Sequence, residues 1–407
     1  MQSRRILVAV SGGIAAYKVP ELVRALIRAG HEVRCALTGA AQEFVSPLVL
    51  QTLTGHAARS ELFDPSEEGE IDHIALADWA ELLVVAPATA NLMARLAHGL
   101  ADDLVSTLAL ATRAPLLLAP AMNVNMWSHP ATQANLRILT ERGAERVGPE
   151  SGELACGWEG EGRMAEPAAI AARAELLLGR RDLEGLRMLV TAGGTREPVD
   201  AVRYLGNRSS GKMGFAVARE AALRGAEVVL VSGPSGQSTP EGVTRLDVET
   251  ALEMRDTVLA ELGAADIVIK TAAVADFRPA APSELKIRKE DLVGDAAFAI
   301  DLVRNPDILA EVCQQKGERI VVGFAAESHD VLDSARRKLA RKGCDLLVAN
   351  DVSRSESGFD VDVNTVSFVW PDRPVEELPA LQKSEVAAQL LDRVSKLVGE
   401  RSPGGRT

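Results

Sequence analysis

Residues 6–13 (ILVAVSGG), close to the start of the chain, contain five apolar residues followed by a serine and a pair of glycines. A short apolar run of this kind is typical of a strand buried on both faces of a parallel sheet, and the glycines allow a tight turn into a helix. Similar runs follow at residues 32–37, 81–86 and 114–119, and residues 18–29 carry apolar side chains on one helical face. This alternation predicts an α/β domain.

The same pattern starts again in the second half of the chain, where residues 188–191 lead into a second glycine pair. Residues 179–185 are charged and almost without apolar side chains, so we place a domain boundary there. The expected domains are 1–180 and 181–400, with a disordered tail at 401–407. Further strands are predicted at 228–232, 267–271, 320–323 and 346–349, and further helices at 167–178, 215–224, 306–315 and 331–341. The expected fold class is α/β, with two Rossmann-like three-layer domains.

Composition narrows the classes of protein. A length of 407 residues predicts two or three domains, and no apolar run approaches the roughly 18 residues of a membrane-spanning helix. The net charge of -12 opposes non-specific binding to nucleic acid or to anionic membranes. The 4 cysteines are far apart and form no C-x-x-C pair, which indicates neither a disulfide framework nor a zinc site. A reducing, cytoplasmic location is expected.

The glycine loops by themselves have two interpretations. Neither loop contains G-x-G-x-x-G, so the glycines either bind a phosphate or only allow close packing of strand and helix. Residues 206–212 (GNRSSGK) satisfy G-x-x-x-x-G-K, but Met213 stands where a Walker-type ATPase has a magnesium-binding hydroxyl. The donors and positive charges of this segment precede a predicted helix and therefore suit an anionic ligand.

Three residues of the first half are candidates for chemistry. His73 lies in a short segment flanked by isoleucines, where a structural role is the alternative. Asn123 follows a predicted strand end, where open α/β sheets bind ligands, and its amide can hold a carboxylate or carbonyl. Cys156 lies in a glycine-rich stretch that is long enough to form a mobile flap, and its thiol could donate a proton. A small buried hydrophobic role is the alternative for this cysteine.

Basic residues of the second half form two groups, which are Lys286, Arg288 and Lys289, and Lys338, Arg341 and Lys342. Such groups are usually solvated helix faces. In an acidic chain, however, they could also neutralise a triphosphate near the predicted strand ends. Asp276 would then be available to magnesium or to the base of a nucleotide.

Taken together, these strings resemble the bacterial bifunctional coenzyme A biosynthesis family, in which phosphopantothenoylcysteine decarboxylase is fused to phosphopantothenate–cysteine ligase. The resemblance runs from about residue 6 to about residue 397. Its first-half motifs are residues 11–18 (SGGIAAYK), 86–91 (APATAN), 120–123 (PAMN) with 126–127 (MW), and 155–157 (ACG). Its second-half motifs are residues 191–198 (TAGGTREP), 207–214 (NRSSGKMG), 272–277 (AAVADF), 305–308 (NPDI) and 349–351 (AND).

The resemblance implies that the first half is a flavodoxin-like, FMN-dependent decarboxylase domain. In this family the flavin oxidises the cysteine thiol carbon to a thioaldehyde, whose sulfur accepts the electrons released as carbon dioxide leaves. His73 is implied to assist at this centre, Asn123 to hold the substrate carboxylate, and Cys156 to protonate the enethiolate. The implied flavin contacts are Ser11, Gly13, Thr38 and Ser106. The family's flavin site lies at a subunit contact of a trimer, which implies a homo-oligomer.

For the second half the resemblance implies a ligase that uses CTP and Mg²⁺. It converts 4′-phosphopantothenate to an acyl-cytidylate, and the amine of L-cysteine then displaces CMP. Lys286 and Lys289 are implied to face the triphosphate, and Asn207 to hold the acyl-cytidylate. Positions that match the family's CTP contacts are Asp276, Asn305, Pro306, Asp307, Ile308, Phe324, Lys338 and Lys342. Asp276 is also the candidate Mg²⁺ ligand, and a ligase dimer and a dodecamer are the assemblies that the family suggests.

Two other classes of protein remain as alternatives. The repeated strand–glycine–helix openings also suit an NAD(P)-dependent oxidoreductase with duplicated Rossmann domains. A non-catalytic, flavin-binding regulatory subunit is the second alternative, and the presence of His73, Asn123 and Cys156 argues against it.

Overall fold

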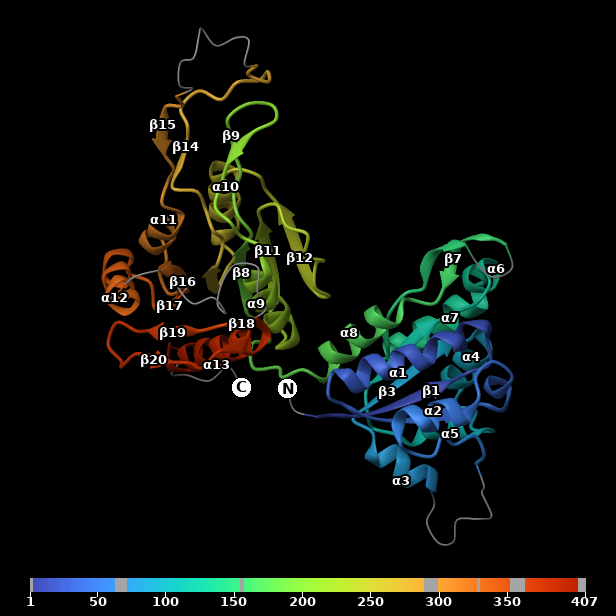
Figure 1. The fold of residues 1–407 in the computed structure, drawn as a ribbon. Coiled ribbons are helices and arrows are strands. Elements are labelled where there is room, and N and C mark those ends of the chain that lie inside the picture. The colour runs from blue at the N-terminus through green and yellow to red at the C-terminus, as the bar shows by residue number, and fades with distance from the viewer. Residues whose placement is uncertain are drawn as a thin grey trace. The chain divides into compact units, whose positions relative to one another are not determined.

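The computed structural model describes residues 3–62, 72–153, 157–288, 299–327, 330–351 and 363–401. The chain divides into two compact units, Met1–Gly179 and Arg180–Thr407 (Figure 1). Residues 402–407 of the expected disordered tail lie outside the described residues. Within the described part of the chain, no helix combines the length and the apolar character needed to cross a bilayer.

The first unit is built on a sheet of parallel strands in the order β2-β1-β3-β4-β5. The strands are β1 (Arg5–Val10), β2 (Glu32–Leu37), β3 (Leu82–Ala88), β4 (Leu116–Pro120) and β5 (Glu145–Arg146). This is the strand order of flavodoxin-like sheets. The order reverses between β1 and β3, and a crevice for ligands opens there at the carboxyl ends of the strands.

Helices cover both faces of this sheet because successive strand residues point to opposite sides. Ile6 and Val8 of β1 belong to the core on one face, and Leu7 and Ala9 belong to the core on the other. The first face is covered by α1 (Val19–Arg28), α2 (Pro47–Thr54) and α8 (Pro167–Leu178). The second is covered by α3 (Asp72–Trp79), α4 (Ala90–His98), α5 (Leu104–Ala111), α6 (Val124–Ser128) and α7 (Pro130–Glu141).

The glycine-rich stretch of the first unit forms an antiparallel hairpin of β6 (Glu150–Glu153) and β7 (Glu159–Arg163). Its residues show no apolar alternation, so sequence reasoning did not predict these strands. Gly152 and Gly160 adopt φ values of +156° and +145°, which are costly for other residues. Glycine therefore supports this hairpin through backbone conformation rather than through side-chain packing.

The second unit contains an eight-stranded sheet in the order β12-β11-β8-β13-β16-β17-β19-β20. Its strands are β8 (Arg187–Ala192), β11 (Glu227–Ser232), β12 (Val243–Asp247), β13 (Ile267–Lys270), β16 (Ile320–Glu327), β17 (Leu346–Asp351), β19 (Val366–Val369) and β20 (Glu376–Glu377). The first six are parallel, and β19 and β20 are antiparallel. Numbered along the chain, the parallel strands follow the Rossmann order 3-2-1-4-5-6, which reverses between β8 and β13.

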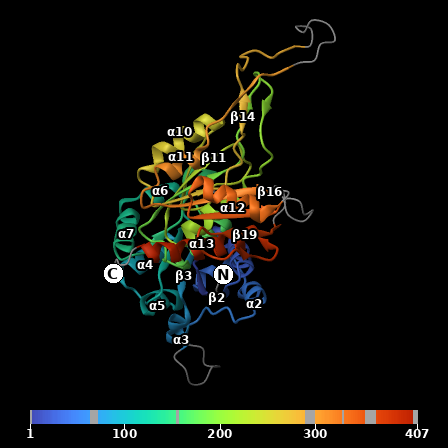
Figure 2. The same ribbon diagram turned by 90° about the vertical axis from the view of Figure 1, so that its left-hand side faces the viewer.

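Helices again cover both faces of the second sheet, so this unit also has three layers. On one face α10 (Ala251–Leu262), α11 (Ile308–Gln314) and α12 (Val331–Lys342) share a core with the strands, and Figure 2 shows α10 beside α11. On the other face α9 (Lys212–Leu223) packs along α13 (Lys383–Arg401). The expected α/β class with two Rossmann-like three-layer domains is therefore confirmed.

Three short antiparallel pairs complete the second unit. They are β9 (Glu197–Pro198) with β10 (Tyr204–Leu205), β14 (Phe277–Pro279) with β15 (Leu302–Arg304), and β18 (Val363–Asn364) with β21 (Leu381–Gln382). The strands β9, β14 and β15 lie beyond the end of the sheet (Figure 1). The helix expected at 306–315 begins only at Ile308, because the Asp307 carboxylate caps it by accepting a hydrogen bond from the Ala310 amide at 3.1 Å.

Candidate active sites

The first cavity has a volume of about 1120 Å³ and lies at the carboxyl ends of β1 and β3. Ser11, Gly13, Thr38 and Asn123, which were predicted from the sequence, all line it. Apolar side chains such as Met122 also face this space. A cavity of this size at the point where the strand order reverses suits a ligand as large as a flavin nucleotide.

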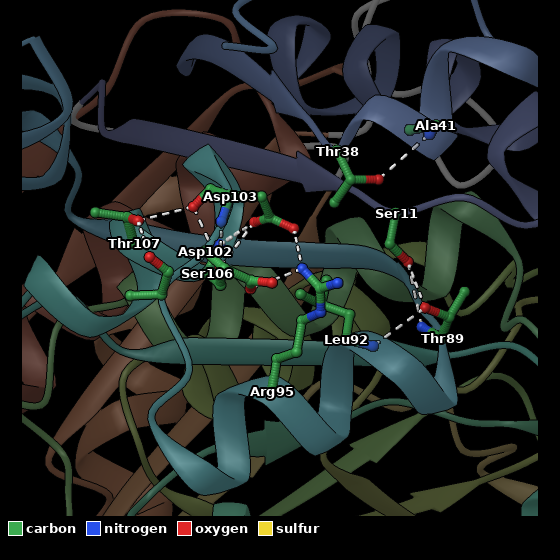
Figure 3. Close-up of polar contacts among 11 residues, drawn as sticks. Ser11, Thr38, Ala41, Thr89, Leu92, Arg95, Asp102, Asp103, Ser106 and Thr107 are labelled. Atoms are coloured by element: carbon green, nitrogen blue, oxygen red, sulfur yellow. Dashed lines mark hydrogen bonds and ion pairs between the residues drawn. The ribbon is translucent and has the colours of Figure 1, made fainter. Parts of the chain in front are cut away.

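The glycine loop of this cavity requires its small residues. A Cβ atom on Gly12 would lie 2.5 Å from the Cβ of Ala40, which is too close for any side chain. The buried Ser11 hydroxyl donates a hydrogen bond to the carbonyl oxygen of Pro87 at 2.6 Å and lies 3.0 Å from the Thr89 hydroxyl (Figure 3). The loop is thereby tied to the end of β3, with its backbone facing the cavity.

An arginine between two carboxylates forms a further part of the wall (Figure 3). Arg95 lies 2.8 Å from both Asp102 and Asp103, and all three residues line the cavity. The Asp103 carboxylate also caps α5 by accepting hydrogen bonds from the Ser106 amide at 2.7 Å and the Ser106 hydroxyl at 2.8 Å. Ser106 is buried and does not line the cavity itself.

The β6–β7 hairpin borders the same cavity through Gly162 and Arg163. It is attached to the Asn123 loop because the Met122 amide donates a hydrogen bond to the Gly162 carbonyl oxygen at 3.0 Å. Asn123 itself caps α6 by accepting a hydrogen bond from the Asn125 amide at 2.8 Å. Cys156 belongs to the connection between β6 and β7 and lies outside the described residues.

The structure separates His73 from these residues. His73 is half-buried in α3, which packs against α5, and it does not line the cavity of its own unit. Conversely, sequence reasoning gave no role to the ion pair of Lys18 and Glu166. Both residues line the cavity, and their Nζ and Oε1 atoms are 2.8 Å apart. The hydrogen bond from Lys18 lowers the pKa of the Glu166 carboxyl.

The second cavity has a volume of about 970 Å³ and lies at the carboxyl ends of β8 and β13. Lys286 is exposed and does not line it, and Lys289 lies outside the described residues. The remaining predicted residues of the second half all face this cavity. They are Asn207, Asp276, Asn305, Pro306, Asp307, Ile308, Phe324, Lys338 and Lys342.

Backbone carbonyl groups orient two of these side chains. The Asn207 amide donates a hydrogen bond to the Val274 carbonyl oxygen at 2.9 Å, and the Asn305 amide donates one to the Ala275 carbonyl oxygen at 2.9 Å. Both asparagines are thus fixed against the loop that follows β13. A positive φ of 78° at Gly211 turns the chain into α9, so the amino end of this helix faces the cavity.

Lysine side chains from two further elements line the second cavity. Lys338 and Lys342 of α12 are joined there by Lys270, the last residue of β13, and Lys342 forms an ion pair with Asp307. Burial lowers the pKa of Lys270 to about 8, with further lowering by Lys338 and Lys342 and an opposing effect of Asp276. Lys270 was missed in the sequence, where it ends an apolar strand without any motif. Only the strand order places it beside α12.

Two family comparisons cover nearly the whole chain. Residues 1–175 match the family described as "Flavoprotein", and residues 183–398 match "DNA/pantothenate metabolism flavoprotein C-terminal domain". The "Coenzyme A biosynthesis bifunctional protein CoaBC" of Escherichia coli (strain K12) is 48% identical over 393 residues, which are 96% of each chain. The chain belongs to this bifunctional coenzyme A biosynthesis family. Its counterpart in Bacillus subtilis (strain 168) is 44% identical over 409 residues, 99% of this chain and 100% of that protein.

Solved structures resemble each part of this family member. The crystal structure of the C-terminal domain of a CoaBC protein is 39% identical, covering 54% of this chain and 99% of that one with a TM-score of 0.47. A PPC decarboxylase mutant complexed with pantothenoylaminoethenethiol is 32% identical, covering 44% and 99% with a TM-score of 0.40. Family membership confirms the expectation of a bifunctional enzyme of coenzyme A biosynthesis. It does not favour the NAD(P)-dependent oxidoreductase or the regulatory subunit.

A buried carboxylate holds the segment that carries Lys286 in this family member. Asp200 accepts hydrogen bonds from the amides of Val202 and Arg203 at 2.8 Å each and from the Ile287 amide at 3.1 Å. Burial by itself would raise the pKa of Asp200, but these hydrogen bonds hold it far below its usual range. Asp200 thus fixes the backbone next to Lys286, a role that no sequence motif indicated.

Proposed function

We propose that the unit Arg180–Thr407 ligates L-cysteine to 4′-phosphopantothenate with CTP, and that the unit Met1–Gly179 decarboxylates the product to 4′-phosphopantetheine. The observation that carries this proposal is the pair of cavities. Each lies where the strand order of a parallel sheet reverses, and each is lined by the motif residues of the corresponding half.

In the first unit the cavity residues fit FMN. Gly12 and Gly13 bring the backbone close to the cavity, Ser11 and Thr38 add hydroxyl groups, and apolar side chains such as Met122 suit a flat ring. FMN, when bound, supplies the two-electron oxidation and the later reduction of the substrate.

The chain's own side chains then bind the substrate and transfer a proton. Asn123 would hold the substrate carboxylate at the cavity wall, next to the β6–β7 hairpin. The thiol of Cys156, in the connection of that hairpin, would donate the proton to the enethiolate carbon after carbon dioxide has left.

A second copy of the chain would complete this site. His73 and Ser106 belong to the implied flavin site, yet neither lines the cavity of its own unit. A trimer contact could bring His73 of one copy to the flavin of another, which supports a homo-oligomer as the active form. A ligase dimer and a dodecamer stay part of the same proposal.

In the second unit the cavity residues fit CTP. The carboxylate of 4′-phosphopantothenate attacks the α-phosphorus of CTP, pyrophosphate leaves, and the amine of cysteine then displaces CMP from the acyl carbon. Lys338 and Lys342 would neutralise the nucleotide, and Asn207 would hold the acyl-cytidylate. Lys286 and Lys289 would face the departing pyrophosphate. Asn305, Pro306, Ile308 and Phe324 would complete the nucleotide site.

Mg²⁺ fits this arrangement as a metal held mainly by phosphate oxygens. Asp276 and Asp307 are the carboxylates among the described lining residues, and Asp307 already pairs with Lys342. Within the described residues there is no cluster of three or more metal-ligating side chains. Because Mg²⁺ commonly uses one or two carboxylates together with substrate phosphates, Asp276 is the proposed protein ligand.

One assay tests both halves of the proposal. The purified protein is incubated with 4′-phosphopantothenate, L-cysteine and either CTP or ATP. The release of the nucleoside monophosphate (CMP or AMP) and the release of carbon dioxide are both measured. We expect a yellow protein that releases CMP and then carbon dioxide. A colourless protein that does not take up added FMN, or the absence of nucleotide cleavage, would contradict the corresponding half.

A further inference from the structure

Two helices begin at one wall of the second cavity. Lys212 and Lys383 are the first residues of α9 and α13, both line the cavity, and the two helices pack along each other (Figure 1). Lys383 is only 7% exposed, which is unusual for a lysine. The amino ends of both helices carry partial positive charge, so this wall is suited to an anionic group.

A buried amide lies at the same wall with one hydrogen-bonding atom unused. Asn364 of β18 is 4% exposed, and its pairing with Leu381 of β21 holds it next to the start of α13. Its Nδ2 atom contacts the sulfur of Met213 at 3.8 Å. Its Oδ1 atom is buried and has no hydrogen-bond partner among the described residues. An unpaired buried acceptor is rare in native proteins and indicates a missing donor.

The two features together fit a ligand that carries a hydrogen-bond donor close to an anionic group. A phosphate would suit the lysines, but as an acceptor-only group it would leave Oδ1 of Asn364 unpaired. An α-amino acid carries an N–H donor and a carboxylate on the same carbon atom, so it can satisfy the amide oxygen and the cationic wall at once. L-Cysteine is the amino acid that the ligase consumes.

We propose that Asn364 and Lys383 form the amino-acid subsite of the ligase cavity, where Oδ1 of Asn364 accepts a hydrogen bond from the cysteine amine and Lys383 binds the cysteine carboxylate. This inference rests on the proposed ligase function. The nitrogen lone pair forms the new C–N bond, the acyl C–O bond to CMP breaks, and the amine loses its proton to water. Asn207, the proposed holder of the acyl-cytidylate, lines the same cavity.

The test uses the full-length wild-type chain and the variants Asn364→Leu and Lys383→Met. With saturating CTP and 4′-phosphopantothenate, each variant should raise the KM for L-cysteine by roughly tenfold or more, because a site group is left unpaired. The KM for CTP should stay unchanged. Lys396→Met, on an exposed position of α13, is the matched control and should behave like the wild type.

Two further measurements separate an effect on L-cysteine binding from a loss of folding or of acyl-cytidylate formation. Pyrophosphate release without any amine reports acyl-cytidylate formation, and it should be equal in all four proteins. Cysteamine lacks the carboxylate, so wild type should prefer L-cysteine to it by roughly tenfold or more in kcat/KM, and Lys383→Met should lose this preference.

The outcomes separate this inference from the ligase function. Absence of pyrophosphate release in the wild type would remove the ligase proposal itself. Three results, each with normal pyrophosphate release, would overturn the amino-acid subsite alone. They are an unchanged KM for L-cysteine in both variants, a raised KM for CTP in either variant, and equal use of cysteamine and L-cysteine by the wild type.

Discussion

The Ser11 hydroxyl donates a hydrogen bond to the carbonyl oxygen of Pro87 at 2.6 Å, and so joins the ends of β1 and β3 where the strand order of the first sheet reverses. These residues are 76 positions apart in the chain. Their contact extends the pairing of the two strands, which ends at Ala9 and Val85, to the loop that lines the proposed flavin cavity.

Replacing Ser11 by alanine should weaken both the fold and flavin binding. The buried carbonyl oxygen of Pro87 loses its donor, which costs about 1–3 kcal/mol in the free energy of unfolding. Urea unfolding and the flavin absorbance per chain measure the two effects. Thr140→Ala removes an exposed hydroxyl bonded to a carbonyl oxygen on α7 and should change stability by less than about 0.5 kcal/mol. Full flavin content in Ser11→Ala would exclude the proposed role.

Replacing Asp200 by asparagine should release the segment around Lys286. The amide loses the charge to which the Ile287 backbone donates, so trypsin should cleave after Lys286 or Arg288 about tenfold faster in native protein. The pKa of the Asp200 carboxyl is lower in the folded state than its unfolded value of about 3.8. The ionised carboxylate therefore stabilises the fold fully above about pH 3.8, and this stabilisation is lost progressively as the pH falls from there through the folded pKa. The difference in cleavage rate between wild type and variant should therefore shrink below about pH 4, with an acid-active protease as the probe. Equal cleavage at pH 7 would contradict this role.

Lys270 should couple nucleotide binding to proton uptake. Its pKa of about 8 leaves it roughly half protonated at pH 8, and a bound triphosphate favours the charged form. Calorimetry of CTP binding in buffers of different ionisation enthalpy should therefore give an uptake of about 0.5 proton at pH 8 and almost none at pH 6. Lys270→Met should abolish the uptake at pH 8. An unchanged uptake in this variant would assign the proton to another group.

Lys286→Gln should impair the ligase and spare the decarboxylase. The charge of Lys286 belongs to the second unit. If Lys286 faces the departing pyrophosphate as proposed, loss of this cation should lower turnover about a hundredfold. Separate assays of CMP release and of carbon dioxide release from synthetic phosphopantothenoylcysteine measure the two activities. Lys396→Gln, an exposed lysine on α13, should leave both unchanged. Equal loss of both activities in Lys286→Gln would refute the assignment of one activity to each unit.

Sequence reasoning succeeded best where a local pattern is sufficient. The strand predicted at residues 32–37 is observed with the same limits, and the helix at residues 167–178 likewise. Element ends were less predictable, since β16 continues to Glu327 rather than ending at residue 323. Its extension pairs with β17 as far as Asp351, and such pairing with a distant strand leaves little trace in the local pattern.

Candidate site residues show the same division. Asn207 and Asn305 stand in motifs and were identified from the sequence, and both line the second cavity. Lys270, Arg95 and Asp200 stand in no motif. Arg95 contacts carboxylates only 7 and 8 positions away, but across the end of a helix. Asp200 binds the Ile287 amide 87 positions away, and Lys270 lies near Lys338, which follows it only after a crossover. Local propensity encodes neither kind of contact.

The amino-acid sequence alone determined the two α/β halves, the glycine turns after their first strands and the family to which the chain belongs, because buried apolar runs and short motifs are local. Only the tertiary structure decided which side chains share a cavity. Strand order depends on how helices cover both faces of a sheet. In the second unit this order brings Lys270 beside Lys338. In the first unit it leaves His73 away from the cavity. The unused amide oxygen of Asn364 likewise became visible only once the start of α13 was placed against α9.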